Sequence, residues 1–398
     1  MAIDTNISHL IESYTPGYSL DQEFYKSPEV YKKEIEEVFL KRWILAGHVS
    51  QIPNSGDFFL VEFDQESVIV TRAKSGDVKA HLNVCRHRGS HICLEKHGNT
   101  KLFTCPYHAW SYDLEGKLVA ARMMGDDFDK SENSLHQANV ELVGGLIFIC
   151  LSDNPPSLSA MKEDLGDTFK MFGFDHMKLA EQKTYSIPAN WKLALENYQE
   201  CYHCTPSHKE FSQIHALAQH PEKFAIAKQA YDARDDLEIR IKPSPFFFDM
   251  EKKGQEGYEY ARYPMLPGLK SGTLGGKPAA PFLGNITKYD SASSEFMTGP
   301  VTFFLIYNDH MVSYRFMPIS IDECVCDIFW FVHEDAKEGT DYDLENLTWL
   351  WDVTTQADKE IIVNNQKGVN SHFYKPGKLA GMETQLQHFL NWYLKTIK

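Results

Sequence analysis

Two short motifs, each with one cysteine and one histidine, constrain this chain more than any other feature. Cys85-Arg86-His87 and Cys105-Pro106-Tyr107-His108 are separated by 17 residues in a chain of 398. They offer two thiolates and two imidazoles, which are donors that bind soft and borderline metal ions. The spacing lets two neighbouring loops deliver all four donors to one small inorganic centre.

Two kinds of centre use this donor set. A structural Cys2His2 zinc site holds the donors in tetrahedral geometry, and its ligand pairs usually have the forms C-x2-4-C and H-x3-5-H. A Rieske [2Fe–2S] cluster has two cysteines on one iron and two histidines on the other. Here each pair mixes cysteine with histidine, which favours the cluster, with Cys85, His87, Cys105 and His108 as ligands. Zinc remains the alternative.

Composition narrows the class of protein. The net charge of −15 opposes binding to nucleic acid or to an anionic membrane surface. No apolar run approaches the roughly 18 residues that span a bilayer, and Met1 to Tyr14 lacks the basic and apolar regions of a signal peptide. We therefore expect a cytoplasmic enzyme with no nucleic-acid or membrane partner.

The cysteine count fits the same expectation. Eight cysteines in a chain this long do not make a disulfide framework. Apart from the two proposed cluster ligands, we expect free thiols at Cys93, Cys150, Cys201, Cys204, Cys324 and Cys326.

The chain divides into three predicted regions. Residues 1–40 are predicted to be helical, especially Pro28 to Phe39, and to pack with the catalytic domain. In residues 41–155, short apolar runs alternate with turns, which predicts a small antiparallel β domain with both metal-binding pairs at loop tips. The breaker-rich Asp153-Asn154-Pro155-Pro156 marks a boundary. Residues 156–398 mix helical segments with long strands, which predicts an α+β domain.

Individual elements of these regions are also predicted. We expect a hairpin turn at Asp113-Leu114-Glu115-Gly116-Lys117. Strands are expected at Phe58–Val61, Val68–Val70, Lys101–Phe103, Gly145–Ile149, Val301–Tyr307 and Ile328–Val332.

A second candidate site lies at His203 and His208. On an ideal helix, residues five apart point about 140° away from each other, so the two imidazoles could share a metal only if the helix ended between them. Pro206 predicts such an end, because proline removes a donor and clashes with the preceding turn. The bend would let the two imidazoles converge on one ion.

Asp358 is the best candidate for a third ligand. The segment Asp343 to Asn365 has apolar residues at helical spacing, and Asp358 falls on the same stripe, seven residues after Trp351. A carboxylate on an apolar face is costly unless it is paired or bound to metal. Two histidines and one carboxylate form the facial triad of non-haem Fe(II) oxygenases. A buried aspartate satisfied by hydrogen bonds is the alternative.

The motifs together resemble a known family. Cys85-Arg86-His87-Arg88-Gly89, Cys105-Pro106-Tyr107-His108-Ala109-Trp110 and Glu196–His208 look like those of the α subunits of Rieske non-haem iron, aromatic-ring-hydroxylating-type oxygenases. In that family an aspartate normally precedes the first iron-binding histidine, whereas Glu200 stands here. This departure resembles the branch that acts on quaternary ammonium compounds. Within that branch, Trp351–Ser371 and Tyr374-Lys375-Pro376-Gly377 look most like glycine betaine demethylases.

The resemblance implies a fold, two metal centres and partners. It implies a Rieske [2Fe–2S] domain followed by a helix-grip-like α+β domain with an antiparallel sheet and a mononuclear Fe(II). Asn197 would lie near the iron, and Glu200 would join the cluster of one subunit to the iron of the next. A homotrimer and a flavin- or ferredoxin-type reductase fed by NAD(P)H are also implied.

The implied reaction is O2-dependent N-demethylation of a quaternary ammonium compound such as glycine betaine, with release of formaldehyde. Oxidation of carnitine, proline betaine or choline, or hydroxylation or O-demethylation of an aromatic acid, are the alternatives. Recognition of a quaternary ammonium ion rests on aromatic faces. The candidates are Tyr202, Phe211, Tyr263, Phe303, Phe304, Tyr307 and Trp330. Strand alternation prevents Phe303 and Phe304 from both facing one site.

Overall fold

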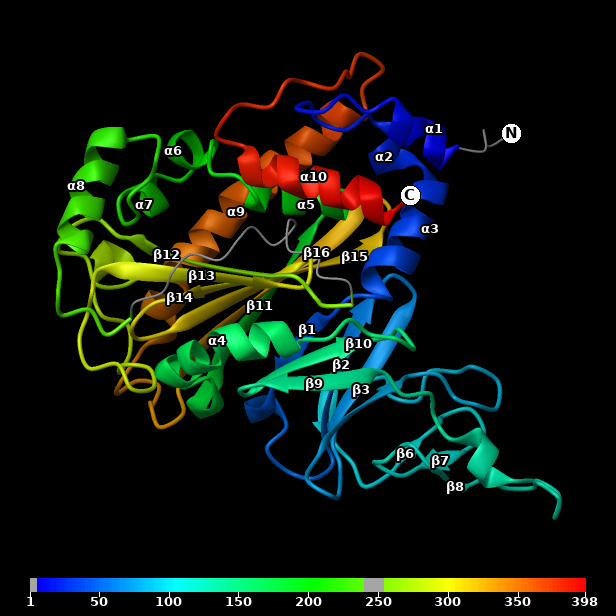
Figure 1. Ribbon diagram of the computed structural model, residues 1–398. Helices are drawn as coiled ribbons and strands as arrows, with labels where there is room; N and C mark the ends of the chain where they lie inside the picture. The colour runs from blue at the N-terminus through cyan, green and yellow to red at the C-terminus, as the bar shows by residue number, and fades with distance from the viewer. Residues whose placement is uncertain (1–5, 240–253) are drawn as a thin grey trace. The chain divides into compact units, whose positions relative to one another are not determined.

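The computed structural model describes residues 6–239 and 254–398 (Figure 1). It contains two compact units, one formed by Leu40–Pro155 and the other by the N-terminal segment up to Phe39 together with Pro156–Lys398. The first five residues of the predicted N-terminal region lie outside the described residues. Among the described helices, none combines the length and apolar character needed to cross a lipid bilayer.

The Leu40–Pro155 unit contains three small antiparallel sheets. One sheet has the order β1 (Ile44–His48), β10 (Leu146–Cys150), β9 (Asn139–Val143). The second has the order β4 (Val78–Leu82), β3 (Glu66–Arg72), β2 (Asp57–Phe63), β5 (His97–Asn99). The third has the order β6 (Phe103–Thr104), β7 (Ser111–Tyr112), β8 (Leu118–Ala120). The prediction of a small antiparallel β fold is confirmed.

The turn between β7 and β8 shows why the sequence forms a hairpin here. The Asp113 N–H donates to the Lys117 carbonyl at 2.9 Å. The Asp113 carboxylate accepts from the backbone N–H groups of Glu115 and Lys117. Gly116 adopts a φ of 83°, a value that glycine reaches without a Cβ clash. The predicted hairpin turn is confirmed.

The second unit is built on a six-stranded antiparallel sheet. Its order is β11 (Met177–Ile187), β16 (Glu323–His333), β15 (Met311–Ser320), β14 (Thr302–Ile306), β13 (Ala292–Thr298), β12 (Tyr258–Pro264). The helices of this unit are α1 (Ile7–Glu12), α2 (Glu23–Lys26), α3 (Pro28–Glu34), α4 (Ser159–Phe172), α5 (Trp191–Tyr198), α6 (Cys204–Ser207), α7 (Lys209–Ser212), α8 (Pro221–Asp232), α9 (Leu344–Val369) and α10 (Thr384–Thr396).

Helices cover both faces of this sheet (Figure 1). On one face, α5 and α9 pack against each other and against β11, β15 and β16. On the other face, Phe169 of α4 packs edge-on against Phe296 of β13, with ring centroids 5.3 Å apart. The helix predicted from Asp343 to Asn365 is α9, and the α+β prediction is confirmed. The helix predicted from Pro28 is α3, which continues as the π-helical turn η1 (Ile35–Phe39).

A buried carboxylate joins the N-terminal segment to two distant helices. Glu34 of α3 forms an ion pair with Lys192 of α5 at 2.6 Å, and both side chains are completely buried. The same carboxylate accepts hydrogen bonds from the Trp191 indole at 2.8 Å and from the Tyr393 hydroxyl of α10. Burial lowers the pKa of Lys192, and the Glu34 charge opposes that shift. The buried positive charge of Lys192 is therefore compensated only while the Glu34 carboxylate is present.

We predict that Glu34→Gln lowers the free energy of unfolding of the unit that contains both residues by about 3–5 kcal/mol, because it leaves the Lys192 charge buried without a counter-ion. Urea unfolding followed by tryptophan fluorescence measures the change. The matched control is Glu36→Gln, whose carboxylate pairs with Lys32 at 3.9 Å with side chains 48% and 78% exposed. An exposed pair of this kind contributes little. Equal effects of the two variants would contradict the role assigned to Glu34.

Candidate metal centres

The two Cys/His motifs form loops with the same backbone hydrogen bonds. In each loop, the cysteine N–H donates to the carbonyl five residues later, and the cysteine carbonyl accepts from the N–H four residues later. The four bonds are Cys85 N to Ser90 O, Gly89 N to Cys85 O, Cys105 N to Trp110 O and Ala109 N to Cys105 O, at 2.8–3.0 Å. One loop geometry is thus built twice.

The residue four positions after each cysteine is left-handed. Gly89 has a φ of 78° and Ala109 a φ of 58°. Alanine in this region costs about 1 kcal/mol or more, so the surrounding structure holds Ala109 in place. This conformation closes each loop tightly around its cysteine carbonyl.

The four side chains separate by type. Cys85 and Cys105 are buried, whereas His87 and His108 are exposed, with their Nδ1 atoms 3.1 Å apart. Burial raises the pKa of Cys85, and the neighbouring Cys105 thiol adds to that shift. Thiols beside thiols and imidazoles beside imidazoles fit a two-iron cluster with one donor type on each iron.

The same geometry disfavours zinc. Ligand atoms around tetrahedral zinc lie within about 4 Å of one another, given zinc–ligand bonds of roughly 2.0–2.3 Å. Within the described part of the chain, only His203, His208 and Asp358 bring three such donor atoms within 4.8 Å of each other.

Aromatic side chains support the loops. The Tyr112 hydroxyl lies 3.3 Å from Cys85 Sγ and accepts a hydrogen bond from the Arg86 N–H at 3.0 Å. Trp110 stacks on the His87 ring with centroids 4.8 Å apart and an interplanar angle of 11°. Hydrogen bonds to the sulfurs and the burial of a cluster set its reduction potential, so Tyr112 is placed to influence that potential.

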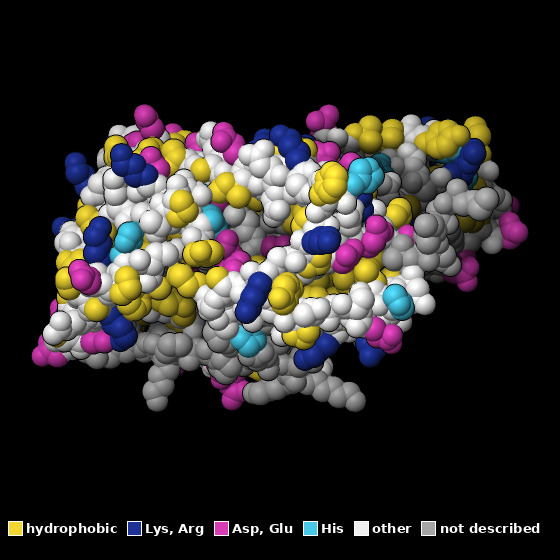
Figure 2. All heavy atoms as spheres, turned by 90° about the horizontal axis from the view of Figure 1, so that it is seen from above, with side chains coloured by type: hydrophobic (Ala, Val, Ile, Leu, Met, Phe, Trp, Pro, Cys, Tyr) yellow, Lys and Arg dark blue, Asp and Glu magenta, His cyan; other side chains and the backbone are white. Residues whose placement is uncertain are grey.

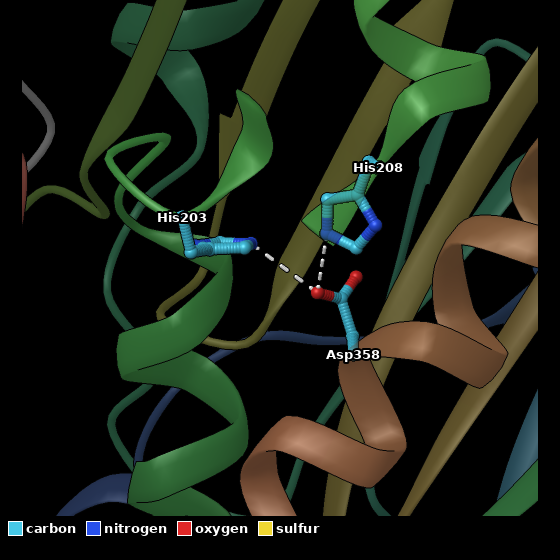
Figure 3. A group of neighbouring side chains, drawn as sticks. All are labelled: His203, His208 and Asp358. Atoms are coloured by element: carbon cyan, nitrogen blue, oxygen red, sulfur yellow. Dashed lines mark hydrogen bonds and ion pairs between the residues drawn. The ribbon is translucent and has the colours of Figure 1, made fainter. Parts of the chain in front are cut away.

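The second centre lies in the unit formed by the N-terminal segment and Pro156–Lys398, which is called the catalytic unit below. Asp358 of α9 points toward both His203 and His208 (Figure 3). Its Oδ1 atom lies 3.2 Å from His203 Nε2 and 2.8 Å from His208 Nε2. Asp358 is four-fifths buried and His208 almost completely buried. Two imidazole nitrogens and one carboxylate oxygen that converge in this way could hold a divalent metal ion.

The two histidines converge because they flank a single helical turn. α6 spans Cys204–Ser207, and His203 and His208 are its N-cap and C-cap. The prediction that Pro206 ends the helix is wrong in detail, since Pro206 lies inside α6 and the helix ends one residue later. Proline is tolerated there because the first-turn N–H groups of a helix have no internal partner.

Glu200 and Asn197 orient His203. His203 Nδ1 donates to Glu200 Oε1 at 2.6 Å, and the His203 backbone N–H donates to Glu200 Oε2 at 3.2 Å. The Asn197 side-chain nitrogen lies 3.4 Å from His203 Nε2. Burial acts to lower the pKa of His203, but the hydrogen bonds to Asp358 and Glu200 outweigh it and raise the pKa to about 9. A divalent cation would take the Nε2 side of this arrangement while Glu200 keeps the ring oriented through Nδ1.

One prediction about the cysteines is wrong. Cys201 and Cys204, expected to be free thiols, form a disulfide with Cα atoms 4.9 Å apart, in the segment that carries His203. The single helical turn at Cys204 brings the two residues close enough to pair. Cys93, Cys150, Cys324 and Cys326 form no disulfide within the described residues, as predicted.

A cavity of about 380 Å³ adjoins His203, His208 and Asp358. Of the predicted aromatic candidates, Phe211 and Tyr263 line it, while Phe303 and Phe304 do not. Figure 2 shows a face on which hydrophobic, acidic and basic side chains are interspersed, with a hollow near its centre in which acidic side chains are visible.

Several cavity residues were not predicted. Tyr198 and Trp351 line the cavity, and so does Glu295, which projects from the otherwise mostly buried strand β13. Strand β13 has the sequence ASSEFMT, which is not an apolar run, so the signal that indicated Asp358 is absent for Glu295. Tyr202, Tyr307 and Trp330, three of the predicted aromatics, do not line the cavity.

Comparison with known proteins agrees with the two centres. The sequence matches the Rieske [2Fe-2S] domain family over residues 42–132 and the ring hydroxylating α subunit (catalytic domain) family over residues 174–398. The chain therefore belongs to the Rieske non-haem iron oxygenase α subunits, with a [2Fe–2S] cluster and a mononuclear iron as cofactors. The predicted family and fold are confirmed.

Particular relatives are similar over nearly the whole chain. The glycine betaine monooxygenase oxygenase subunit of Pseudomonas aeruginosa is 34% identical, covering 96% of this chain and 90% of the relative. The glycine betaine monooxygenase oxygenase subunit of Chromohalobacter salexigens is 33% identical, covering 96% of this chain and 86% of the relative. A solved quaternary ammonium Rieske monooxygenase, studied for carnitine oxidation, has the same fold with a TM-score of 0.74, 21% identity and full coverage of both chains.

We predict that Asp358→Ala and His208→Ala each abolish binding of the mononuclear iron and turnover while the cluster absorption spectrum stays intact. The reason is that the two donor sets lie in separate compact units. Iron and acid-labile sulfide per chain, together with the visible spectrum, measure both centres. Asp352→Ala is the matched control on α9, because Asp352 pairs with Lys183 at 3.2 Å, outside the triad. Full iron content in Asp358→Ala would identify another carboxylate as the third ligand.

Proposed function

We propose that this chain is the oxygenase component of a monooxygenase that removes an N-methyl group from glycine betaine. The observation that carries the proposal is the similarity to two glycine betaine monooxygenase oxygenase subunits across 96% of the chain. The cavity supports a substrate with a cationic group, since its described lining includes Glu200, Glu295 and Asp358 but no lysine or arginine.

The proposal gives each donor set a role. Cys85, His87, Cys105 and His108 hold the [2Fe–2S] cluster, and His203, His208 and Asp358 hold the mononuclear iron. When bound, these groups supply single-electron transfer and O2 activation, while the protein supplies orientation and exclusion of water. Overall, one oxygen atom of O2 enters an N-methyl C–H bond and the other leaves as water, with two electrons and two protons consumed. The resulting hemiaminal collapses to formaldehyde and dimethylglycine.

Glu200 is proposed to connect the two centres between subunits. Its carboxylate accepts from His203 Nδ1 through one oxygen and from backbone N–H groups through the other. Two carboxylate oxygens offer about four acceptor positions, so one further hydrogen bond, from a cluster imidazole of a neighbouring subunit, remains feasible. A ring of subunits related head to tail meets this requirement, and we propose a homotrimer.

The electron source is also part of the proposal. The family implies a separate reductase, and we propose one of the flavin and ferredoxin type that takes electrons from NAD(P)H. Because NAD(P)H is supplied in the cytoplasm, we place the enzyme there.

Oxygen uptake with a panel of glycine betaine, carnitine, proline betaine and choline tests the function, using the purified chain, NAD(P)H and a reductase. We predict formaldehyde in a 1:1 ratio to O2 consumed with glycine betaine, from a red-brown protein. Carnitine is the second candidate because the carnitine monooxygenase oxygenase subunit of Escherichia coli is 36% identical over 201 residues. If the enzyme oxidised carnitine and not glycine betaine, carnitine would replace glycine betaine as the proposed substrate. A colourless protein that holds zinc and no sulfide would overturn the proposed oxygenase function.

We predict that Glu200→Gln stops electron transfer from the reduced cluster to the iron site, because it weakens the charge-assisted hydrogen bond to His203. Single-turnover reoxidation of the cluster by O2, with substrate present, measures the loss. Dithionite reduction and iron content should remain unchanged, because Glu200 contacts His203 Nδ1 and not the Nε2 side that faces Asp358. In Glu200→Asp, electron transfer from the cluster to the iron site should be impaired less than in Glu200→Gln. Wild-type reoxidation in Glu200→Gln would show that the connection lies elsewhere.

A further inference from the structure

Glu295 is a carboxylate with an unusual position in the catalytic unit. It lies in the middle of β13, paired with Ala261 of β12 on one side and Leu305 of β14 on the other. Its neighbours along the strand, Ser294 and Phe296, are buried, whereas the Glu295 side chain retains accessible surface. That surface faces the cavity beside the iron triad, which Glu295 and Leu305 line together.

The alternation of the sheet explains why Glu295 faces this cavity. Phe296 points to the opposite face, where it packs against Phe169 of α4 and stacks on Phe304 at 5.0 Å. Residues one position apart on a strand face opposite sides of the sheet. Glu295 therefore lies on the side of α5 and α9, which carry Tyr198 and Asp358.

No described side chain neutralises the Glu295 carboxylate. It has neither a hydrogen bond nor an ion pair within the described residues, and the charge that acts on it is that of another acid, Glu259 of β12. Burial, with the Glu259 charge in addition, raises the pKa of Glu295 to about 7. The side chain keeps accessible surface toward the cavity, so its charge is available to a cationic group that binds there.

Tyrosine rings surround this carboxylate. The Glu295 charge is the largest cause of the raised pKa of Tyr263, and after burial it also raises the pKa values of Tyr198 and Tyr307. Tyr198 and Tyr263 line the same cavity. A carboxylate beside aromatic faces suits a quaternary ammonium ion, which has no hydrogen-bond donor and binds through charge and π-electrons.

We propose that Glu295 is the specificity-determining carboxylate that recognises the quaternary ammonium group of the substrate, with Tyr198 and Tyr263 contributing aromatic faces. This inference rests on the proposed function. It assigns to the sheet side of the cavity the discrimination between a quaternary ammonium group and a neutral group of the same shape.

The test compares glycine betaine with its carbon isostere 3,3-dimethylbutyrate, in which a quaternary carbon replaces the nitrogen. In Glu295→Gln at pH 8, the KM for glycine betaine should rise by at least about tenfold, with a small change in kcat. The inhibition constant of 3,3-dimethylbutyrate should stay the same or fall, because the variant removes a charge that disfavours a neutral group. Calorimetric titration with tetramethylammonium should show the same loss of affinity without turnover.

Two controls separate recognition from structure. Glu259→Gln removes the neighbouring charge outside the iron cavity, where Glu259 accepts from Gln385 at 3.3 Å, and its KM should stay within about twofold of wild type. The melting temperature of Glu295→Gln should stay close to that of wild type, because the Glu295 side chain is exposed and has no hydrogen bond or ion pair to lose within the described residues. The proposal would be overturned if Glu295→Gln weakened the binding of glycine betaine and of 3,3-dimethylbutyrate equally, or if the KM for glycine betaine were unchanged.

The outcomes distinguish this inference from the proposed function. A wild-type enzyme that oxidises no quaternary ammonium compound and binds no tetramethylammonium overturns both. A wild-type enzyme that demethylates glycine betaine while Glu295→Gln retains the wild-type KM overturns only the role of Glu295.

Discussion

The buried ion pair between Glu34 and Lys192 holds the helix that leads into the candidate iron site. Lys192 lies in the first turn of α5, and the chain leaves the end of that helix directly into Glu200 and His203. A second buried contact, from the Tyr25 hydroxyl to both oxygens of Glu196, holds the same helix near its C-terminal end. The N-terminal segment thus fixes both ends of the helix that positions the first histidine.

This contact explains why residues 6–39 group with Pro156–Lys398 although the Leu40–Pro155 unit follows them in sequence. An ion pair excluded from water stabilises only when both partners are present and hydrogen-bonded. Glu34 meets that condition through contacts with three side chains, from α5 and α10. The scaffold is rigid where the site needs precision, since a ligand set tolerates errors of only about half an ångström.

The sequence predicted those parts of the sites that depend on local pattern. Both Cys/His loops and the pair His203 and His208 are short motifs whose residue types alone restrict the chemistry. Asp358 was predictable because a long helix repeats its apolar stripe regularly. Glu295 was missed because its neighbours across the sheet, Ala261 and Leu305, come from segments whose pairing the sequence does not reveal. The Cys201–Cys204 disulfide was missed because it depends on the fold of one short turn.

Asp358 and Glu295 are two carboxylates that line one cavity, yet their surroundings differ. Two imidazoles contact Asp358, and their hydrogen bonds overcome burial and lower its pKa. Burial and the charge of Glu259 raise the pKa of Glu295 instead. Under the proposed function, Asp358 would share a metal ion with the two histidines, whereas Glu295 would meet the cationic group of the substrate. Proteins break the rules of stable packing mainly at functional sites, and these two acids do so on either side of one cavity.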